Sequence, residues 1–386
     1  MTNVAVIGTG FIGRLHVQEL MRVPRVRVAA VADENLASAK ELAEQYGIDV
    51  YTDDYRALLK DPAIAVFHNC TPNHLHYSIN KEILEAGRQL LCEKPLAVDA
   101  SQAEELQKLA EERGLSTGVN FCYRYYPVVQ EMACRVRRGE IGRIHSVAGH
   151  FYQDWLLYDT DYNWRLDKRF SGNSLAVADI GTHWCDLSQF VLGSRITEVM
   201  ADLQTVIPVR KKGARSANTF SGGENKPEEL TEVPVELEDA GSVLVHFENG
   251  TRGVFSVCQL CAGRKVSIDL QVYGTASSLE WRHERPNEFW QGYRDKPNAV
   301  FCESPSLQSK ETARYARLPS GHPTGYADAM RNLFCDFYES IGRGGGAVKP
   351  PDFRDGWNEM KIVEAVLQSN AAKAWTSVRG SHSNKE

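Results

Sequence analysis

Two groups of residues in the sequence are of types that can move protons or stabilise charge. Asp179 and His183 are four positions apart, which places them on one face if the segment is helical. A histidine that is oriented by a carboxylate can exchange a proton near neutral pH, although this spacing alone is more typical of a pair on a helix surface. Lys94 stands between Glu93 and Pro95, directly after an apolar run. Its ammonium could stabilise a negative charge that develops on a substrate.

Three glycines near the start have the spacing of a turn that binds a dinucleotide. Gly8, Gly10 and Gly13 form the pattern G-x-G-x-x-G between an apolar run and a helical pattern. In such a turn the glycines allow a tight bend, close approach of the backbone to a pyrophosphate, and close packing of helix on strand. The N–H groups at the start of the helix then hold the phosphates. Glycine turns are common, so this motif needs the support of its neighbours.

Asp33 gives that support, because it ends the second apolar run twenty residues beyond Gly13. A carboxylate at this place accepts hydrogen bonds from the adenosine ribose. The next residues are Glu34 and Asn35, and no lysine or arginine appears before Lys40. A 2′-phosphate on the ribose would therefore meet negative charge, and we expect NAD rather than NADP.

The predicted elements explain how these residues would be positioned. Strands are predicted at 3–8, 26–32, near 50, 63–70, 89–92 and 115–120, and helices at 9–23, 36–46, 55–60, 74–87 and 101–114. This alternation predicts a doubly wound parallel sheet, whose ligands bind beyond the carboxyl ends of its strands. The loops at 70–76 and 92–95 follow two of these strands, so Lys94 is expected at the cofactor edge.

The second half of the sequence predicts a different layout, with several strands between helices. Helices are predicted at 127–138, 174–192, 326–341 and 353–374, and strands at 144–155, 198–207, 241–247, 253–260, 266–273 and 278–281. The polar stretch 210–232 predicts a long surface loop, which could cover a site, contact a subunit or be disordered. The tail 379–386 is expected to be disordered.

Composition limits the classes of function. At 386 residues the chain is long enough for two domains, and its net charge of -6 gives no reason to bind nucleic acid or an anionic membrane. Nine scattered cysteines favour a reducing compartment. No apolar run reaches the ~20 residues that span a bilayer, and no signal peptide precedes the first strand, so we expect a cytoplasmic protein. Cys258 and Cys261 have C-x-x-C spacing, but they lie in a predicted strand and are interpreted as packing residues.

Taken together and in order, several motifs resemble one oxidoreductase family, glucose–fructose oxidoreductase/inositol dehydrogenase, often written Gfo/Idh/MocA. They are "GTGFIG", "TPNHLH", "CEKPLA", "NWRLD", "DIGTHWCDL" and "GYADAMRNLFCDF", and they extend over nearly the whole chain. The resemblance implies an α/β protein with a Rossmann domain, here 1–123, and a C-terminal α/β domain with a large, open, mostly antiparallel sheet, here 124–378. Residues 379–386 would be a flexible tail.

The resemblance also implies functional residues. The family's catalytic lysine, aspartate and histidine fall on Lys94, Asp179 and His183. The cofactor would be lined by Gly8, Gly10, Phe11, Ile12, Gly13, Asp33, Thr71, Pro72, Asn73, His76, Glu93, Lys94, Trp164 and Arg165. The substrate would meet Tyr123, Arg124, Gln153 and Trp155 in addition to the catalytic residues. Two questions stay open: whether His183 or Lys94 is the base, and whether Glu93 orients Lys94, touches the cofactor or is structural.

The activity implied is hydride transfer between NAD and a hydroxyl carbon of a sugar, glycoside, anhydrosugar or cyclitol. The chain looks most like the branch of levoglucosan and glycoside 3-dehydrogenases. Two alternatives are an NAD-dependent glycosidase with transient oxidation and a dinucleotide-binding regulator without turnover. A carbohydrate partner and a homodimer or homotetramer are implied. No ligand cluster for a metal is apparent, so no metal is expected.

Overall fold

The computed structural model describes residues 1–213, 230–341 and 349–378. By packing, the chain divides into two compact units. The first contains Met1–Cys122 and Tyr326–Met360, and the second contains Tyr123–Gly325 and the rest of the described chain. The domain boundaries expected from the sequence, 1–123 and 124–378, stay a prediction. Residues 326–360 pack with the first unit although they follow the second along the chain.

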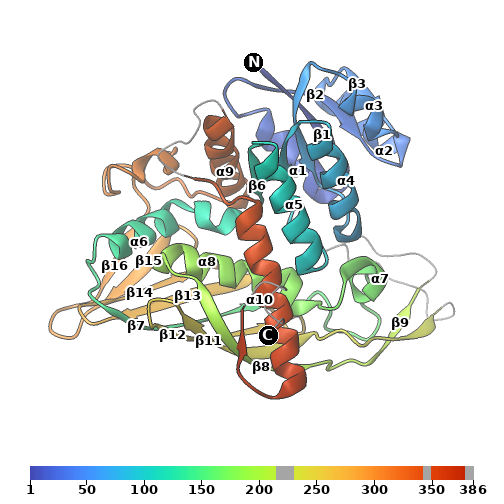
Figure 1. Ribbon diagram of the computed structural model, residues 1–386. Helices are drawn as coiled ribbons and strands as arrows, with labels where there is room; N and C mark the ends of the chain where they lie inside the picture. Colours follow the sequence, from blue (N-terminus) through green and yellow to red (C-terminus); the bar gives the residue numbers. More distant parts are fainter. Residues whose placement is uncertain (214–229, 342–348, 379–386) are drawn as a thin grey trace. The chain divides into compact units, whose positions relative to one another are not determined.

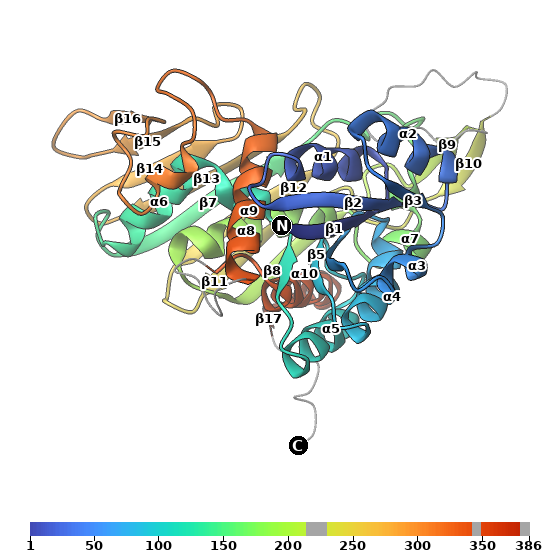
Figure 2. The same ribbon diagram turned by 90° about the horizontal axis from the view of Figure 1, so that it is seen from above.

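The first unit is built on a six-stranded parallel sheet in the order β3-β2-β1-β4-β5-β6. The strands are β1 (Thr2–Ile7), β2 (Val26–Ala32), β3 (Val50–Thr52), β4 (Ile64–Asn69), β5 (Gln89–Cys92) and β6 (Thr117–Val119). Figure 2 shows β1 beside β2. The order reverses between β1 and β4, which is where such sheets bind dinucleotides. The predicted parallel, doubly wound arrangement is confirmed.

Helices connect these strands. They are α1 (Phe11–Leu20), α2 (Leu36–Tyr46), α3 (Tyr55–Leu59), α4 (Asn73–Glu85) and α5 (Ala100–Glu112). Asn35 caps α2 by accepting hydrogen bonds from the N–H groups of Ala37 and Ser38. The later helix α9 (Tyr326–Ile341) packs against α1 in the same unit, and α10 (Phe353–Ala372) begins there.

The second unit contains a nine-stranded sheet in the order β16-β15-β14-β13-β7-β12-β11-β8-β17. Its strands are β7 (Ile144–Tyr152), β8 (Ile196–Gln204), β11 (Ala240–Phe247), β12 (Arg252–Cys258), β13 (Ser267–Gly274), β14 (Ser278–Arg282), β15 (Glu288–Gly292), β16 (Ala299–Cys302) and β17 (Thr376–Ser377). All neighbouring pairs are antiparallel except β7 with β12. The predicted large, mostly antiparallel sheet is confirmed.

Two helices, α6 (Pro127–Arg137) and α8 (Thr182–Leu192), cover one face of this sheet (Figure 1). Trp184 of α8 is fully buried, stacks on Phe255 of β12 with 4.7 Å between ring centroids, and donates a hydrogen bond to the carbonyl of Asp269. Gly149 of β7 leaves room for this ring, because a Cβ there would lie 2.2 Å from the indole nitrogen of Trp184. The sheet therefore holds α8 in a defined position.

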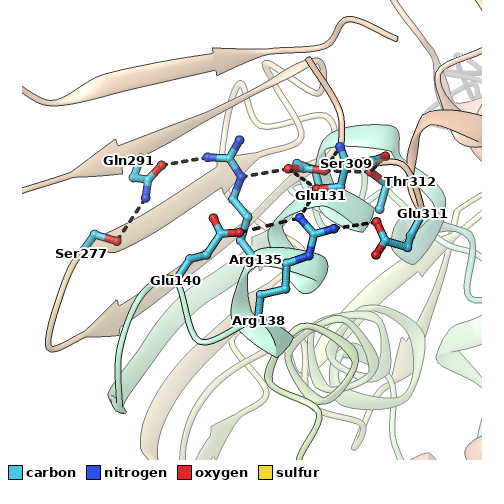
Figure 3. Close-up of polar contacts among 9 residues, drawn as sticks. All are labelled: Glu131, Arg135, Arg138, Glu140, Ser277, Gln291, Ser309, Glu311 and Thr312. Atoms are coloured by element: carbon cyan, nitrogen blue, oxygen red, sulfur yellow. Dashed lines mark hydrogen bonds and ion pairs between the residues drawn. The ribbon is translucent and has the colours of Figure 1, made fainter. Parts of the chain in front are cut away.

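The buried carboxylate of Glu131 connects α6 to the chain that follows β16 (Figure 3). It accepts hydrogen bonds from Ser309 N at 2.9 Å and Thr312 Oγ1 at 2.7 Å. Arg135 donates to the same carboxylate at 3.0 Å and to Gln291 of β15 at 3.0 Å. These contacts join a helix, a strand and a long loop around one charge.

Some elements were not predicted from the sequence. These are β15, β16, β17, the helix α7 (Lys168–Ser171), and the two-stranded sheet of β9 (Val209–Lys212) and β10 (Thr231–Pro234). The last two form the ends of the predicted loop 210–232, and its positions 214–229 lie outside the described residues, as does the tail 379–386. No described helix has the length and apolar character needed to cross a membrane.

Candidate active site

The glycine turn after β1 has the features that a dinucleotide site requires. Gly8 has φ +90°, a conformation that L side chains rarely adopt, and a Cβ there would lie 2.6 Å from the carbonyl oxygen of Cys70. A Cβ on Gly13 would lie 1.9 Å from the carbonyl oxygen of Gly8. A Cβ on Gly10 would meet nothing within 4 Å. Gly10 therefore leaves open space at the start of α1, where backbone N–H groups can hold a pyrophosphate.

Asp33 connects the end of β2 to this turn. Its Oδ2 accepts hydrogen bonds from Thr9 N at 2.6 Å and Thr9 Oγ1 at 2.9 Å, and its Oδ1 accepts one from Asn35 N at 2.9 Å. Asn35, not Asp33, caps α2. Because the Asp33 carboxylate remains partly exposed beside the glycine turn, it fits a ribose diol.

The loop after β4 is held by its own polar groups. Thr71 donates from its N–H and hydroxyl to Asn69 Oδ1, and Pro72 precedes the first turn of α4, where Asn73 lies. The fully buried ring of His76 lies between two carbonyl oxygens, that of Pro95 at 2.7 Å from Nδ1 and that of Thr71 at 2.8 Å from Nε2. His76 thus lies between the loop after β4 and the corner after β5, and its contact with the cofactor stays a prediction.

The corner after β5 carries Lys94. The Lys94–Pro95 peptide bond is cis. The buried Glu93 carboxylate accepts a hydrogen bond from Lys94 N at 3.2 Å and others from His16 and Asn120. Burial alone would raise the pKa of Glu93, but the contacts with His16, Asn120 and Lys94 outweigh it and lower that pKa. Both carboxylate oxygens of Glu93 thus have protein partners, which favours an orienting role over cofactor contact.

In the second unit, Asp179 lies in a wide helical turn. Residues Val177–Gly181 form a π-helix that runs into α8, and Thr182 N donates to the carbonyl of Val177. Such turns often occur at functional sites. The carboxylate of Asp179 lies 3.6 Å from Arg165 Nε and accepts a hydrogen bond from Gln259 Nε2 at 3.1 Å. A guanidinium and an amide therefore fix this carboxylate.

His183 follows in the first turn of α8 and is buried among aromatic rings. Its ring lies edge-on to Tyr123 at 4.8 Å between centroids and 5.9 Å from Phe151. Arg165, from the segment before α7, lies over the ring of Trp164 at 4.4 Å. The structure thus groups Asp179 with Arg165 and Trp164, and His183 with Tyr123.

The other predicted substrate residues differ in their surroundings. The guanidinium of Arg124 is buried and makes a bidentate ion pair with Asp186 of α8, 2.7 Å from Nε to Oδ2, and its contact with substrate stays a prediction. Trp155 donates from its indole to Gln153 Oε1 at 3.1 Å. The aromatic and amide groups of Trp155 and Gln153 form a unit of the kind that a sugar ring contacts. Their role in substrate binding stays a prediction.

Two residues near Asp179 were missed from the sequence. Gln259 lies in the middle of the "CQLC" motif, which was interpreted only for its cysteines; the strand ends at Cys258 instead of continuing, so Gln259 enters a turn. Glu238 is buried, and its Oε1 accepts hydrogen bonds from Ser174 Oγ, Leu175 N and Val177 N at the start of the segment that carries Asp179. Sequence spacing carries no signal for a contact between residues this far apart.

Comparison with known proteins identifies the family of the chain. Residues 2–121 match the model of the oxidoreductase family with an NAD-binding Rossmann fold, and residues 129–280 match the C-terminal domain model of the same family. The chain belongs to the Gfo/Idh/MocA oxidoreductase family. Its N-terminal part is the NAD-binding fold of that family, as the glycine turn and Asp33 indicated.

The relatives of this Gfo/Idh/MocA chain include sugar and cyclitol dehydrogenases. It is 29% identical to levoglucosan dehydrogenase of Pseudarthrobacter phenanthrenivorans, over 97% of this chain and 98% of the relative. It is similar to the structure of levoglucosan dehydrogenase with NADH and L-sorbose, with a TM-score of 0.88, 27% identity, and coverage of 98% and 99% of the two chains. It is also similar to the structure of an inositol dehydrogenase homologue with NAD+ from Azotobacter vinelandii. The TM-score is 0.84, the sequence identity is 26%, and 97% of each chain is covered.

Proposed function

We propose that this oxidoreductase transfers a hydride between NAD and a hydroxyl carbon of a sugar, glycoside, anhydrosugar or cyclitol. The observation that carries the proposal is Lys94, held by a buried network on a corner at the carboxyl edge of a sheet whose glycine turn and Asp33 fit NAD. The similarity to levoglucosan dehydrogenase over nearly the whole chain supports a carbohydrate as the substrate.

The residues divide the work of alcohol oxidation. NAD, when bound, supplies the hydride acceptor. The ammonium of Lys94 stabilises the negative charge that develops on the substrate oxygen. The ionised Glu93 beside Lys94 favours this cationic role, which leaves the imidazole of His183 to accept the hydroxyl proton. We assign Asp179 as the carboxylate that acts with Lys94 and His183. Arg165 and Gln259 fix the position of this carboxylate.

The remaining site residues are assigned to binding the cofactor or the substrate. The N–H groups of Phe11 and Ile12 begin α1 and are placed for the pyrophosphate, and the Thr71–Asn73 loop borders the same edge of the sheet. We assign Trp164 and Arg165 to the nicotinamide end. Tyr123, Gln153 and Trp155 are assigned to the substrate.

A direct assay tests the activity. The purified protein is incubated with NAD and a panel of free sugars, glycosides, anhydrosugars and cyclitols, and NADH is followed at 340 nm, with NADP in parallel. The proposal expects NADH formation with at least one of these compounds. Cleavage of an aryl glycoside without net NAD reduction would replace the dehydrogenase by an NAD-dependent glycosidase. Tight NAD binding with neither reaction would favour a regulator.

Replacing the lysine tests the mechanism. K94A is expected to lower kcat by about 10²–10³-fold, because the charge that stabilises the substrate oxygen is lost. The dissociation constant of NAD should stay within about threefold, since the glycine turn and Asp33 are unchanged. K81A, which removes a surface lysine of α4 that pairs with Glu105 of α5, is the matched control and should retain activity. Near-normal turnover of K94A would contradict the assignment.

We further propose a cytoplasmic homo-oligomer, a dimer or a tetramer. Free thiols at all nine cysteines support a reducing compartment. On the nine-stranded sheet, the cross-strand pairs Leu244–Val254 and Trp290–Val300 all have exposed side chains, which supports a face that a second subunit covers. Light scattering with size-exclusion chromatography measures the mass in solution, and a 43 kDa monomer at micromolar concentration would exclude this assembly.

A further inference from the structure

Four polar side chains, three of them buried and that of Tyr338 half-buried, form a line through the nucleotide-binding unit to the corner that carries Lys94. Tyr338 OH lies 2.8 Å from His68 Nε2, His68 Nδ1 lies 2.9 Å from His16 Nδ1, and His16 Nε2 lies 2.9 Å from Glu93 Oε1. Both histidines are fully buried. The residues come from α9, β4, α1 and the end of β5, so one line of contacts crosses the unit.

The surroundings of this line are aromatic. Phe334 of α9 lies edge-on to both imidazoles, with centroids 4.9 Å from His16 and 5.0 Å from His68, and the ring of Tyr338 is parallel to that of His68. Water cannot replace a lost partner easily in such a place, so each polar atom depends on its neighbour. The direction of each hydrogen bond follows from the protonation states of Glu93 and His16.

The assignment starts at Glu93. Its carboxylate is ionised and only accepts hydrogen bonds, so His16 Nε2 carries the proton. If His16 is neutral, its Nδ1 accepts, and the proton of His68 is on Nδ1. His68 in turn accepts at Nε2 from the hydroxyl of Tyr338. Burial and the neighbouring His16 lower the pKa of His68 well below its usual value, and burial raises the pKa of Tyr338, in agreement with a neutral His68 and a protonated phenol.

All donors in the line thus point toward Glu93. Moving protons one step along it would leave a phenolate at Tyr338, which its raised pKa opposes, and would protonate Glu93, whose pKa is lowered. The line is therefore unsuited to carry a proton away from the site. What it does is hold one oxygen of Glu93, while the other oxygen accepts the N–H of Lys94.

We propose that Tyr338, His68 and His16 are positioning residues that fix Glu93 and, through it, the corner that carries Lys94. This inference rests on the proposed catalytic role of Lys94. Tyr338 lies on α9, so a helix from the late part of the sequence helps to position the catalytic lysine in this proposal. His76, bonded to the Pro95 carbonyl, holds the same corner independently of this line.

The first test is kinetic. Y338F removes one hydroxyl and leaves His68 Nε2 without its donor, and we expect kcat to fall about fivefold, the effect of one buried hydrogen bond. The NAD dissociation constant should stay within about twofold. Y77F is the matched control, because it removes a phenol–carboxylate hydrogen bond to Glu105 on the surface of α4 in the same unit, and it should leave kcat unchanged.

A double-mutant cycle shows whether Tyr338 acts through Glu93. E93Q should lower kcat more than Y338F does, and adding Y338F to E93Q should cost less than twofold, because the link to Lys94 is already broken. Independent, multiplying effects would overturn the proposal. So would a Y338F protein with lowered melting temperature but wild-type kcat, which would make the line structural only.

The second test does not depend on activity. Nitrogen-15 chemical shifts of the imidazoles, assigned with H16N and H68N, should show a protonated Nε2 on His16 and a protonated Nδ1 on His68 in the wild type. Y338F should move the His68 Nε2 resonance, and Y77F should not. The opposite tautomers or a charged imidazole would overturn the assignment. If no polyol in the panel supports NAD reduction by the wild type, the proposed function fails. The chemical shifts still decide whether the line of hydrogen bonds exists.

Discussion

Asp33 makes three hydrogen bonds to Thr9 and Asn35 and still exposes part of its carboxylate. Its charge therefore has two effects. It fixes the glycine turn, and in the proposed cofactor site it would face the 2′ position of the ribose. These effects can be separated by a substitution that keeps the shape and removes the charge.

We expect D33N to weaken NAD binding about tenfold, because charge-assisted hydrogen bonds become neutral ones. The ratio of kcat/KM for NADP to that for NAD should rise by a similar factor, since the repulsion of a 2′-phosphate is lost. Isothermal titration and steady-state kinetics with both cofactors measure this. D61N, in a turn that precedes β4, is the control. An unchanged cofactor ratio would show that Asp33 does not face the ribose.

In the second unit, Gln259 can be tested by a single substitution in the same way as Asp33. Q259A is expected to lower kcat about fivefold with little change in NAD affinity, because Asp179 loses the amide that fixes its Oδ2. Q271A removes a similar amide–carboxylate hydrogen bond, from Gln271 to Asp269 on β13, and should have no such effect. If both variants change kcat equally, the effect is general to the sheet and not specific to Asp179.

The residues that sequence reasoning found are those governed by local rules. Gly8 and Gly13 occupy a turn where a Cβ would collide with backbone, so their spacing alone is informative. Tyr338 contacts His68 across 270 positions, and Gln259 contacts Asp179 across 80. Such contacts depend on the completed fold, and no local sequence pattern predicts them.

At the scale of elements, the segment before α8 is held by a buried acid. Glu238 accepts the N–H groups of Leu175 and Val177 and the hydroxyl of Ser174. Burial raises the pKa of Glu238, and the hydrogen bonds oppose this less strongly. The unfolded value is about 4.3, so folding favours the protonated form. Its contribution to stability is present below about pH 4.3 and is lost as the pH rises through the folded-state pKa.

E238Q has a neutral amide of the same shape and should not show this loss. The difference in melting temperature between E238Q and wild type is expected to shift in favour of E238Q from pH 5 to pH 8. E238A removes the acceptor and should be destabilised by about 1–3 kcal/mol at both values. Differential scanning fluorimetry across pH measures all three proteins. A difference between E238Q and wild type that stays constant with pH would contradict this account.

Elements with strong periodicity were predictable, and several short ones were not. The predicted ranges 26–32, 36–46 and 326–341 agree with β2, α2 and α9. The strands β15 and β16 have five and four residues, too few for alternation to be recognised, and they gain their identity from pairing with β14 and each other. A regular helix was predicted through Asp179, and no local sequence signal marks the π-helical turn found there.

At the scale of the molecule, buried histidines make stability depend on pH. Burial lowers the pKa of His76 and His283, and burial with His16 lowers that of His68. Their unfolded value is about 6.5. Folding therefore favours the neutral rings, and this stability is present above about pH 6.5 and is lost as the pH falls toward the lowered folded values.

We expect the free energy of unfolding to decrease from pH 7 to pH 5, by up to about 1.4 kcal/mol per pH unit for each such histidine. Chemical denaturation at several pH values measures the slope. H283F should reduce the slope, and H322Q, at an exposed loop position, should not. A free energy that is independent of pH over this range would mean that these rings have the same pKa in the folded and unfolded states.

The pairing of β6 with the distant segment near Pro351 has a consequence for biosynthesis. The N–H of Val119 donates to the carbonyl of Pro351, and the N–H of Phe353 donates to Thr117. When the ribosome has made all six parallel strands, the residues that cover this edge and the helix that encloses His16 and His68 have yet to be translated. The nascent sheet must therefore wait with an open edge, a natural target for chaperones, until almost the whole polypeptide has emerged.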